Sequence, residues 1–325
     1  PTGWYRRLPG NTRWSRPLEA GNRSTARVGR AMKQITGILV KQRETPFEHV
    51  SKLLPGWMKS DLPRKWKRIG SVLIIRVPEK LKEHAQEIAE AYSILPGISS
   101  VVETGNISGE LRQPSGVRLL YGDSTETTVI EYGISYRLDV AKQMWSAGNV
   151  GWRAGPRGPP RVKAIYDFHN PRVIVDCFAG VGYFALQMAK AYPNAKIIAI
   201  DKNPESIQYL RQNIELNSIV NIEVVNKDCR DEYRKADVIH LGYIGGTCDF
   251  LSHASNCLEY SGKIIFHEVY RDKWLGFKKR SDWDSMPANL SKKMNEHSCV
   301  VEAFARVKAY GPSSSHIVAR LKRGN

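Results

Sequence analysis

The sequence predicts an α/β fold built on a mostly parallel sheet, with a smaller α+β region before it. Three observations support this fold class. Residues 173–201 follow the order strand, glycine loop, helix, strand, and apolar β-branched runs then alternate with helical segments as far as residue 297. Two strands of alternating character close the chain around Gly311-Pro312. Strands that alternate with helices favour a doubly wound parallel sheet, and the closing strands add an antiparallel pair.

The glycine loop predicts a site for a nucleotide cofactor. A β-branched run ends at Asp176, and a second apolar run, residues 196–200, ends at Asp201. Between these runs, Gly180 and Gly182 form a tight turn in which the backbone can approach a ligand closely.

Two cofactors fit such a unit. The run from Gly180 to Ala185 satisfies the G-x-G-x-x-A form of the dinucleotide fingerprint, with Asp201 placed to bind a ribose. However, Asp176 would repel a pyrophosphate above the helix N-terminus. S-adenosylmethionine (AdoMet) has no phosphate and carries a sulfonium and an ammonium group. The order D-x-F-x-G-x-G, which includes Phe178, resembles the class I AdoMet-dependent transferases, and this resemblance implies a Rossmann-like, mostly parallel seven-stranded sheet. A glycine turn without a ligand is the structural alternative.

The remaining elements follow from periodicity and turn signals. In the cofactor-binding part we expect helices at 184–191, 203–214, 248–258 and 285–297, and strands at 222–225, 237–241, 263–269, 302–310 and 316–321. Before it we expect a helix at 46–54, a strand at 72–75, a helix at 79–95, a strand at 99–102 and a hairpin of 127–131 with 135–139. The glycine- and proline-rich segment 153–161 reads as a mobile basic loop. The predicted domains are a partly flexible basic extension (1–60), a small α+β domain (61–145) and the catalytic domain (146–325).

The charge of the chain predicts a polyanionic partner. The formal net charge is +17 over 325 residues, and residues 1–70 alone carry sixteen Lys/Arg and four Asp/Glu, a net of +12. Such a field raises both the affinity and the encounter rate for phosphate backbones. The extension interleaves arginines with Trp4, Tyr5 and Trp14, and it leads to a basic run with Arg64, Lys65, Lys67 and Arg68. A generally basic proteome or a solvated tail would explain the charge without a nucleic acid.

Cysteine and histidine usage indicates neither disulfides nor a metal. The five cysteines are odd in number and scattered, without a C-x-x-C, and the histidines share no ligand spacing. No run of about eighteen apolar residues predicts a membrane span. We therefore expect a monomeric cytoplasmic protein that does not associate with membranes.

Four blocks resemble the archaeal and eukaryotic family that modifies guanosine 37 of transfer RNA. They are the segment from Tyr136 to Asn149, the segment 176–182, the segment 237–244, and the strands from Val307 to Val318. This family contains tRNA guanine-37 N1-methyltransferases and the wybutosine-synthesis aminocarboxypropyltransferases. The resemblance covers about residues 65–325.

The third block separates these two activities. The methyltransferases carry Asn-Leu-Pro where this chain has Gly242-Tyr243-Ile244, which is similar to the Gly-Tyr-Val of the aminocarboxypropyltransferases. The resemblance implies transfer of the 3-amino-3-carboxypropyl group of AdoMet to the tricyclic precursor, 4-demethylwyosine, at position 37 in the anticodon loop of tRNA-Phe. Methylthioadenosine is then released. Sulfonium is a good leaving group for both reactions, so orientation selects the product, and no protein nucleophile is expected. N1-methylation of guanosine 37 and non-catalytic tRNA binding stay open as alternatives.

The resemblance also implies roles for individual residues. Ser146 and Arg153 would contact the methionine part of AdoMet, although Gly151-Trp152 stands where the family has a charged pair. The remaining cofactor residues would be Asp176, Phe178, Gly180, Gly182, Asp201 on the ribose, Asp228 on the adenine amino group, and Cys229. Gly242, Tyr243 and His316 would position the reacting base. Transfer RNA would be held by Lys142, Asn149, Lys308 and Tyr310, together with Arg64, Lys65, Lys67 and Arg68.

Overall fold

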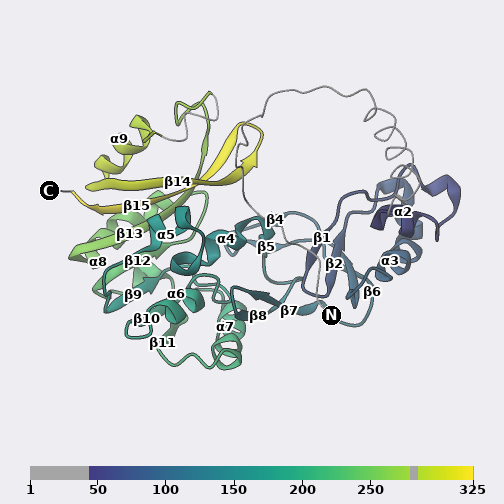
Figure 1. Ribbon diagram of the computed structural model, residues 1–325, viewed down its shortest axis with the longest axis horizontal. Helices are drawn as coiled ribbons and strands as arrows, with labels where there is room; N and C mark the ends of the chain where they lie inside the picture. The colour runs from purple at the N-terminus through teal and green to yellow at the C-terminus, as the bar shows by residue number, and fades with distance from the viewer. Residues whose placement is uncertain (1–43, 279–284, 325) are drawn as a thin grey trace, which may run out of the picture. The chain divides into compact units, whose positions relative to one another are not determined.

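A seven-stranded sheet with the strand order β11-β10-β9-β12-β13-β15-β14 forms the centre of the C-terminal part (Figure 1). The computed structural model describes residues 44–278 and 285–324. The strands are β9 (Val173–Asp176), β10 (Lys196–Ile200), β11 (Ile222–Val225), β12 (Ala236–Leu241), β13 (Leu258–Arg271), β14 (Cys299–Gly311) and β15 (Ser314–Arg323). The pairs from β11 to β13 are parallel, and β15 pairs antiparallel with both β13 and β14. The predicted fold class is confirmed.

Helices cover both faces of this sheet because each strand alternates its side chains between two cores. One core contains Ile174 and Ile197 and residues of α5 (Pro160–Tyr166), α6 (Ala185–Ala191) and α7 (Pro204–Leu216). The other contains Val175 and Ile198 and residues of α8 (Leu251–Cys257) and α9 (Ala288–Glu296). The sheet is therefore doubly wound.

The strand order places the site. The chain leaves β9 toward β10 and β11 on one side, then crosses over to β12 on the other side of β9. Ligands of such sheets bind beyond the carboxyl ends of the strands at this switch point. Asp176 ends β9, Asp201 follows β10, and Gly242 follows β12, so the structure brings these three residues to one edge.

The glycines of the loop after β9 are required by its geometry. Gly180 has a φ of +53°, and a Cβ there would lie 2.4 Å from the Tyr183 ring. Gly182 has a φ of +101°, and a Cβ there would lie 2.6 Å from the side chain of Leu186. A side chain at either position would therefore meet both backbone strain and a steric clash.

The mobile loop predicted for 153–161 is wrong. This segment folds as the end of α4 (Val150–Arg153), the 3-10 helix η4 (Gly155–Arg157) and the start of α5. Trp152, Val162 and Tyr166 anchor it because their side chains are almost completely buried. Pro160 suits the first turn of α5, where a proline costs no helix hydrogen bond.

The region before the sheet contains a second sheet with the order β1-β2-β3-β6 and two hairpins, β4-β5 and β7-β8. The strand bounds are β1 (Lys67–Ile69), β2 (Val72–Ile75), β3 (Ser100–Glu103), β4 (Ile107–Ser108), β5 (Gln113–Pro114), β6 (Arg118–Tyr121), β7 (Glu126–Glu131) and β8 (Ile134–Asp139). The helices are α2 (Pro46–Ser51), the 3-10 helices η1 (Gly56–Met58) and η2 (Glu79–His84), and α3 (Ala85–Ser93). The predicted hairpin turn is present, since Tyr132 and Gly133 have φ values of +49° and +71°.

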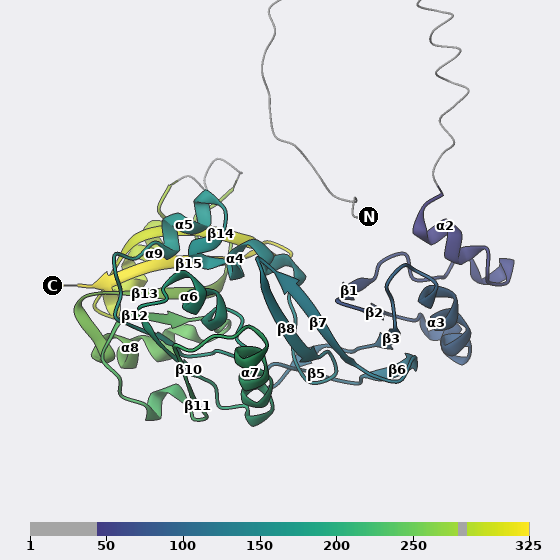
Figure 2. The same cartoon turned by 60° about the horizontal axis from the view of Figure 1, so that its bottom comes forward.

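Side-chain amides of α7 form hydrogen bonds with the backbone of β8. Figure 2 shows the β7-β8 hairpin beside α7. Asn213 accepts from the Arg137 amide at 2.7 Å and donates to the Arg137 carbonyl at 3.0 Å. Asn217 makes the same pair of bonds with Ser135.

In the part of the chain that is described, no helix is long and apolar enough to cross a bilayer. The predicted arm with Trp4, Tyr5 and Trp14 lies outside the described residues, and the bounds of the three predicted domains stay a prediction.

Candidate active site

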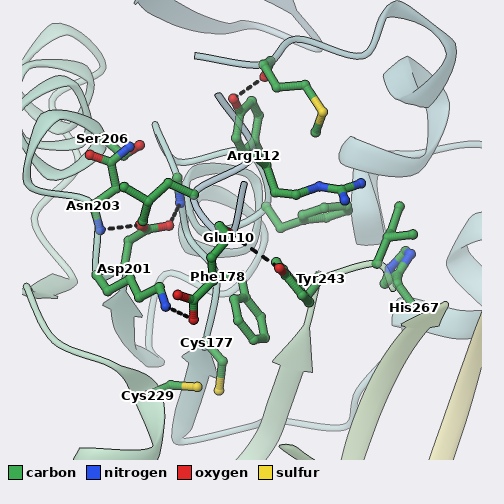
Figure 3. A pocket seen from close by; sticks show the side chains of 18 of the residues that line it. Glu110, Arg112, Cys177, Phe178, Asp201, Asn203, Ser206, Cys229, Tyr243 and His267 are labelled. Atoms are coloured by element: carbon green, nitrogen blue, oxygen red, sulfur yellow. Dashed lines mark hydrogen bonds and ion pairs between the residues drawn. The ribbon is translucent and has the colours of Figure 1, made fainter. Parts of the chain in front are cut away.

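A cavity of about 350 Å³ lies at the carboxyl ends of β9, β10 and β12, a volume typical of small-molecule sites. Figure 3 shows Asp201 and Asn203 on one side of it and Tyr243 and His267 on the other. The predicted site residues that line it are Lys142, Ser146, Asn149, Arg153, Phe178, Gly180, Asp201, Asp228, Cys229, Gly242, Tyr243 and His316. Those outside its lining are Asp176, Gly182, Lys308, Tyr310 and the basic residues Arg64, Lys65, Lys67 and Arg68.

The two strand-end carboxylates have different surroundings. Asp201 accepts from the backbone amides of Gly180 at 2.8 Å and Asn203 at 2.9 Å, and burial raises its pKa. Asp176 is completely buried, and one of its oxygens lies 3.0 Å from Nδ1 of His240. Its other oxygen, Oδ2, has no partner in the protein. Asp201 therefore faces the cavity, whereas Asp176 is directed to a histidine on the neighbouring strand.

Asp228 is held by an arginine at the cavity wall. Its carboxylate accepts from the Arg230 amide at 3.0 Å and from Nε and Nη2 of the same side chain at 2.9 and 2.7 Å. The guanidinium group lowers the pKa of Asp228 to about 2. Cys229, the next residue, is buried against Cys177, whose thiol pKa is raised by that contact and by burial.

Aromatic rings form one wall. Phe178 stacks on Tyr243 with ring centroids 5.0 Å apart, and it meets Phe250 edge-on at 4.9 Å. The Tyr243 hydroxyl donates to the Glu110 carbonyl at 3.3 Å, which fixes the ring from the β4-β5 hairpin (Figure 3). Such a wall suits the flat, apolar faces of a nucleobase.

Arg153 is buried with its own carboxylate partner. Its Nε and Nη2 donate to Glu131 at 2.7 and 2.6 Å, and its Nη1 donates to the Ser146 carbonyl at 2.7 Å. The Ser146 hydroxyl accepts from Lys308, whose pKa is lowered by burial and by the nearby Arg153 and Lys67. Since a guanidinium has five N–H groups, Arg153 keeps donors beyond these three bonds for a ligand.

Gly242 has no room for a side chain. A Cβ at this position would lie 2.8 Å from Cε1 and 3.2 Å from Nδ1 of His240. These atoms belong to a completely buried ring that bonds Asp176, so the ring cannot simply turn away. The glycine after β12 is thus matched to the histidine two residues before it.

The residues predicted to hold RNA are dispersed. Lys142 pairs with Glu205 at 3.1 Å beside the cavity, and the amide oxygen of Asn149 is buried without a partner. Tyr310 is half exposed, and its hydroxyl accepts from Arg112 at 3.2 Å.

Arg68 differs from its neighbours in the basic run. It donates to the carbonyls of Gly70, Pro96 and Gly97, so it also ties together the loops of the small sheet. Arg64, Lys65, Lys67 and Arg68 are all exposed.

Among the residues around the cavity that sequence reasoning missed, two sets shape the wall next to Tyr243. The tip of the β4-β5 hairpin, Glu110 to Arg112, lines the cavity although it is far from the glycine loop in sequence. Glu268 accepts from the amides of Gly245, Gly246 and Thr247 at 2.6, 3.0 and 2.9 Å, which holds the loop after Tyr243. The sequence contains a signal for Glu268, because it is a carboxylate within the mostly apolar strand predicted at 263–269.

The strand order, the glycine loop and the acids after β9 and β10 define the fold of a class I AdoMet-dependent transferase. Residues 127–295 match the model of the TRM5/TYW2 methyltransferase domain, and residues 47–125 match that of the TYW2 N-terminal domain. The chain belongs to the TRM5/TYW2 family.

Individual relatives agree over most of the chain. A tRNA(Phe) (4-demethylwyosine(37)-C(7)) aminocarboxypropyltransferase of Pyrococcus horikoshii is 34% identical over 281 residues, which is 85% of this chain and 95% of the relative. The structure of P. horikoshii TYW2 in complex with MeSAdo has a TM-score of 0.67 at 30% identity and covers 85% of this chain and 97% of that one. The structure of Methanocaldococcus jannaschii TYW2 in complex with AdoMet has a TM-score of 0.57 at 29% identity. It covers 80% of this chain and 100% of that one.

Proposed function

We propose that this chain transfers the 3-amino-3-carboxypropyl group of AdoMet to carbon 7 of 4-demethylwyosine at position 37 of tRNA-Phe and releases methylthioadenosine. The names of the relatives and the match of residues 47–125 to a TYW2 domain support this reaction over N1-methylation. The observation that carries the choice is Gly242. An asparagine there, as in the methyltransferases, would collide with the His240 ring.

The residues around the cavity fit AdoMet as the donor. The Asp201 carboxylate suits ribose hydroxyls, and the Phe178–Tyr243 wall suits adenine. The buried amide oxygens of Gln143 and Asn149 have no partner in the protein and line the cavity, so they can accept from the α-ammonium group. The remaining donors of Arg153 suit the carboxylate. When bound, AdoMet supplies an electrophilic carbon with a thioether as its leaving group.

The protein contributes orientation. The Phe178–Tyr243 stack is held by Phe250 on one side and by the Glu110 carbonyl on the other. Glu268 fixes the loop that follows Tyr243. A wall fixed in this way can hold AdoMet in one orientation, which we propose is the one with the γ-carbon toward the base, and a well-oriented pair of reactants removes much of the entropic barrier.

The partner is tRNA, and the anticodon loop of tRNA-Phe is the proposed target. Lys142 and Asn149 line the cavity, whereas Lys308 and Tyr310 bond to the lining residues Ser146 and Arg112, and these contacts support entry of the base on this side. Five unpaired cysteines support action in the cytoplasm, and a monomer is the proposed state.

The test combines purified protein and AdoMet with tRNA carrying 4-demethylwyosine and, in a separate reaction, with tRNA carrying guanosine at position 37. With the first tRNA we expect the nucleoside to gain an aminocarboxypropyl group in place of one hydrogen, with methylthioadenosine as the small product. A gain of one methyl group with S-adenosylhomocysteine would replace the proposal by N1-methylation. Binding of AdoMet without any transfer to either tRNA would leave a non-catalytic tRNA-binding protein.

A further inference from the structure

A chain of five buried polar side chains connects the end of β9 with the cavity. Asp176 Oδ1 lies 3.0 Å from His240 Nδ1, and His240 Nε2 lies 3.2 Å from the Tyr166 hydroxyl. That hydroxyl lies 2.8 Å from His267 Nε2, and His267 Nδ1 lies 3.0 Å from His316 Nε2. Each of the five residues is at most 2% exposed, and His267 and His316 line the cavity.

With Asp176 ionised and the imidazoles neutral, the direction of every bond is determined. A carboxylate only accepts, so His240 donates from Nδ1 and accepts at Nε2 from Tyr166. The Tyr166 oxygen then accepts from His267 Nε2, and His267 accepts at Nδ1 from His316 Nε2. His316 Nδ1 is consequently left with a lone pair, and this atom is buried without a partner in the protein.

The two histidines at the cavity are uncharged at neutral pH. Burial and the nearby Lys308 lower the pKa of His316 to about 3. Burial and the neighbouring His316 and His240 lower the pKa of His267 well below its ordinary value. The charged group that lowers the pKa of His316 is Lys308 on β14, and Arg153 in turn lowers the pKa of Lys308.

The proposed function creates a need for a proton acceptor. As carbon 7 of the base forms its bond to the γ-carbon, the γ-carbon–sulfur bond breaks and its electron pair goes to sulfur. Carbon 7 still carries its hydrogen, and the ring regains aromaticity only when this proton leaves. Until that proton leaves, the ring carries the positive charge, and this charge makes the C–H bond at carbon 7 strongly acidic. A weak neutral base is therefore sufficient to remove the proton.

Resting on the proposed function, we propose that His316 Nδ1 accepts this proton and that the buried chain carries the charge to His240. His316 passes its Nε2 proton to His267, His267 passes its Nε2 proton to Tyr166, and Tyr166 passes its hydroxyl proton to His240. One proton enters and the charge ends as an imidazolium beside the Asp176 carboxylate. The positive charge thereby leaves the neighbourhood of Lys308 and gains an ionic partner.

Gly242 supports the same arrangement. A Cβ at this position would lie 2.8 Å from His240 Cε1, so only glycine leaves that ring in line with both Asp176 and Tyr166.

The experiment uses the full chain with His316→Gln, His316→Ala and Tyr166→Phe, and with His169→Gln at an exposed position as the control. In single-turnover experiments we expect the rate of aminocarboxypropyl transfer to be about 100-fold or more lower in the His316 variants than in the wild type, as for removal of a general base. Free imidazole should partly restore His316→Ala. With substrate deuterated at carbon 7, the His316 variants should show a larger isotope effect than the wild type, because proton removal becomes slow. AdoMet affinity, measured by calorimetry, should stay within about twofold of the wild type in all variants.

A readout independent of activity is the ¹⁵N spectrum of the imidazoles. We expect His267 and His316 of the wild type to be Nε2-protonated neutral tautomers, and Tyr166→Phe to change the His267 signals. Folded His316 variants with wild-type rates and isotope effects, or Nδ1-protonated His316 in the wild type, would overturn the relay. The rate and isotope-effect outcomes presuppose wild-type aminocarboxypropyl transfer, and the ¹⁵N spectrum needs no transfer, so all of them are distinct from a failure of the proposed function itself.

Discussion

The buried histidines should make the stability of this protein depend on pH in the mildly acidic range. In the folded chain the pKa of His316 lies at about 3, whereas the ordinary pKa of a histidine, as in an unfolded chain, is 6.5. Between these values the unfolded state binds more protons, so the free energy of unfolding falls as the pH falls below about 6.5. The contribution is fully present above that pH and continues to decline toward about pH 3.

The magnitude follows from the pKa shift. One pKa unit corresponds to about 1.4 kcal/mol, so a histidine that stays neutral in the fold costs about 2 kcal/mol between about pH 7 and about pH 5. His316 is only 2% exposed, so solvent screening reduces this figure little. His267 is equally buried and burial also lowers its pKa, so it changes the free energy of unfolding in the same direction.

Urea unfolding followed by tryptophan fluorescence at the two pH values measures this effect. Carboxylates also titrate there, so the informative quantity is the difference between variants. Between about pH 7 and about pH 5, we expect the free energy of unfolding to fall by about 2 kcal/mol less in His316→Gln than in the wild type. The control, His169→Gln, removes an exposed histidine and should follow the wild type. Parallel losses in wild type and His316→Gln would refute the argument that His316 is held neutral.

Three further predictions concern single side chains. Glu131→Gln should lower the free energy of unfolding by about 3–5 kcal/mol because Arg153 loses its buried charge partner, and adding Arg153→Met should restore part of it in a double-mutant cycle. Gly242→Ala should slow aminocarboxypropyl transfer and lower the free energy of unfolding by about 1–3 kcal/mol. The control is Gly311→Ala, where an added Cβ would have no atom within 4 Å, and it should change neither quantity. Equal effects of the two substitutions would contradict the clash at Gly242. Lys65→Gln should reduce the slope of log affinity for tRNA against log salt by about 0.7–0.9 if this exposed lysine contacts a phosphate, and an unchanged slope would remove it from the interface.

Local patterns were sufficient for most of the large sheet and for part of the site, but not for the short elements β1, β4, β5, β6, α4 and α5. The apolar runs and the Asn203-Pro204 start of α7 are signals within a few residues, and the helices and strands expected from them are present. The segment 153–161 was misjudged because its order depends on burial of Trp152 and Tyr166 in a core made by distant strands. Glycine and proline content alone cannot report such packing.

The histidine chain could not be predicted because it depends on strand order. Its histidines lie far apart in sequence with no shared spacing. They meet because β12 pairs with β9, placing His240 opposite Asp176, and because β15 pairs with β13, placing His316 opposite Val269. The same pairing explains why Asp176, predicted to bind the cofactor, also lies beside an imidazole. Register across a sheet is set by the whole topology and leaves no mark in a short window of sequence.

The contact between Gly242 and His240 has a consequence for how the two reactions of this family can interconvert. A glycine-to-asparagine change alone would place a side chain against an imidazole that is fixed by Asp176 and Tyr166. Removal of the imidazole alone would leave a void and an unpaired carboxylate in the core. Each single step therefore passes through a damaged enzyme, and only the simultaneous exchange of both positions avoids it. Residues 240 and 242 should thus be inherited as a pair, and an engineered conversion from aminocarboxypropyl to methyl transfer must begin with both.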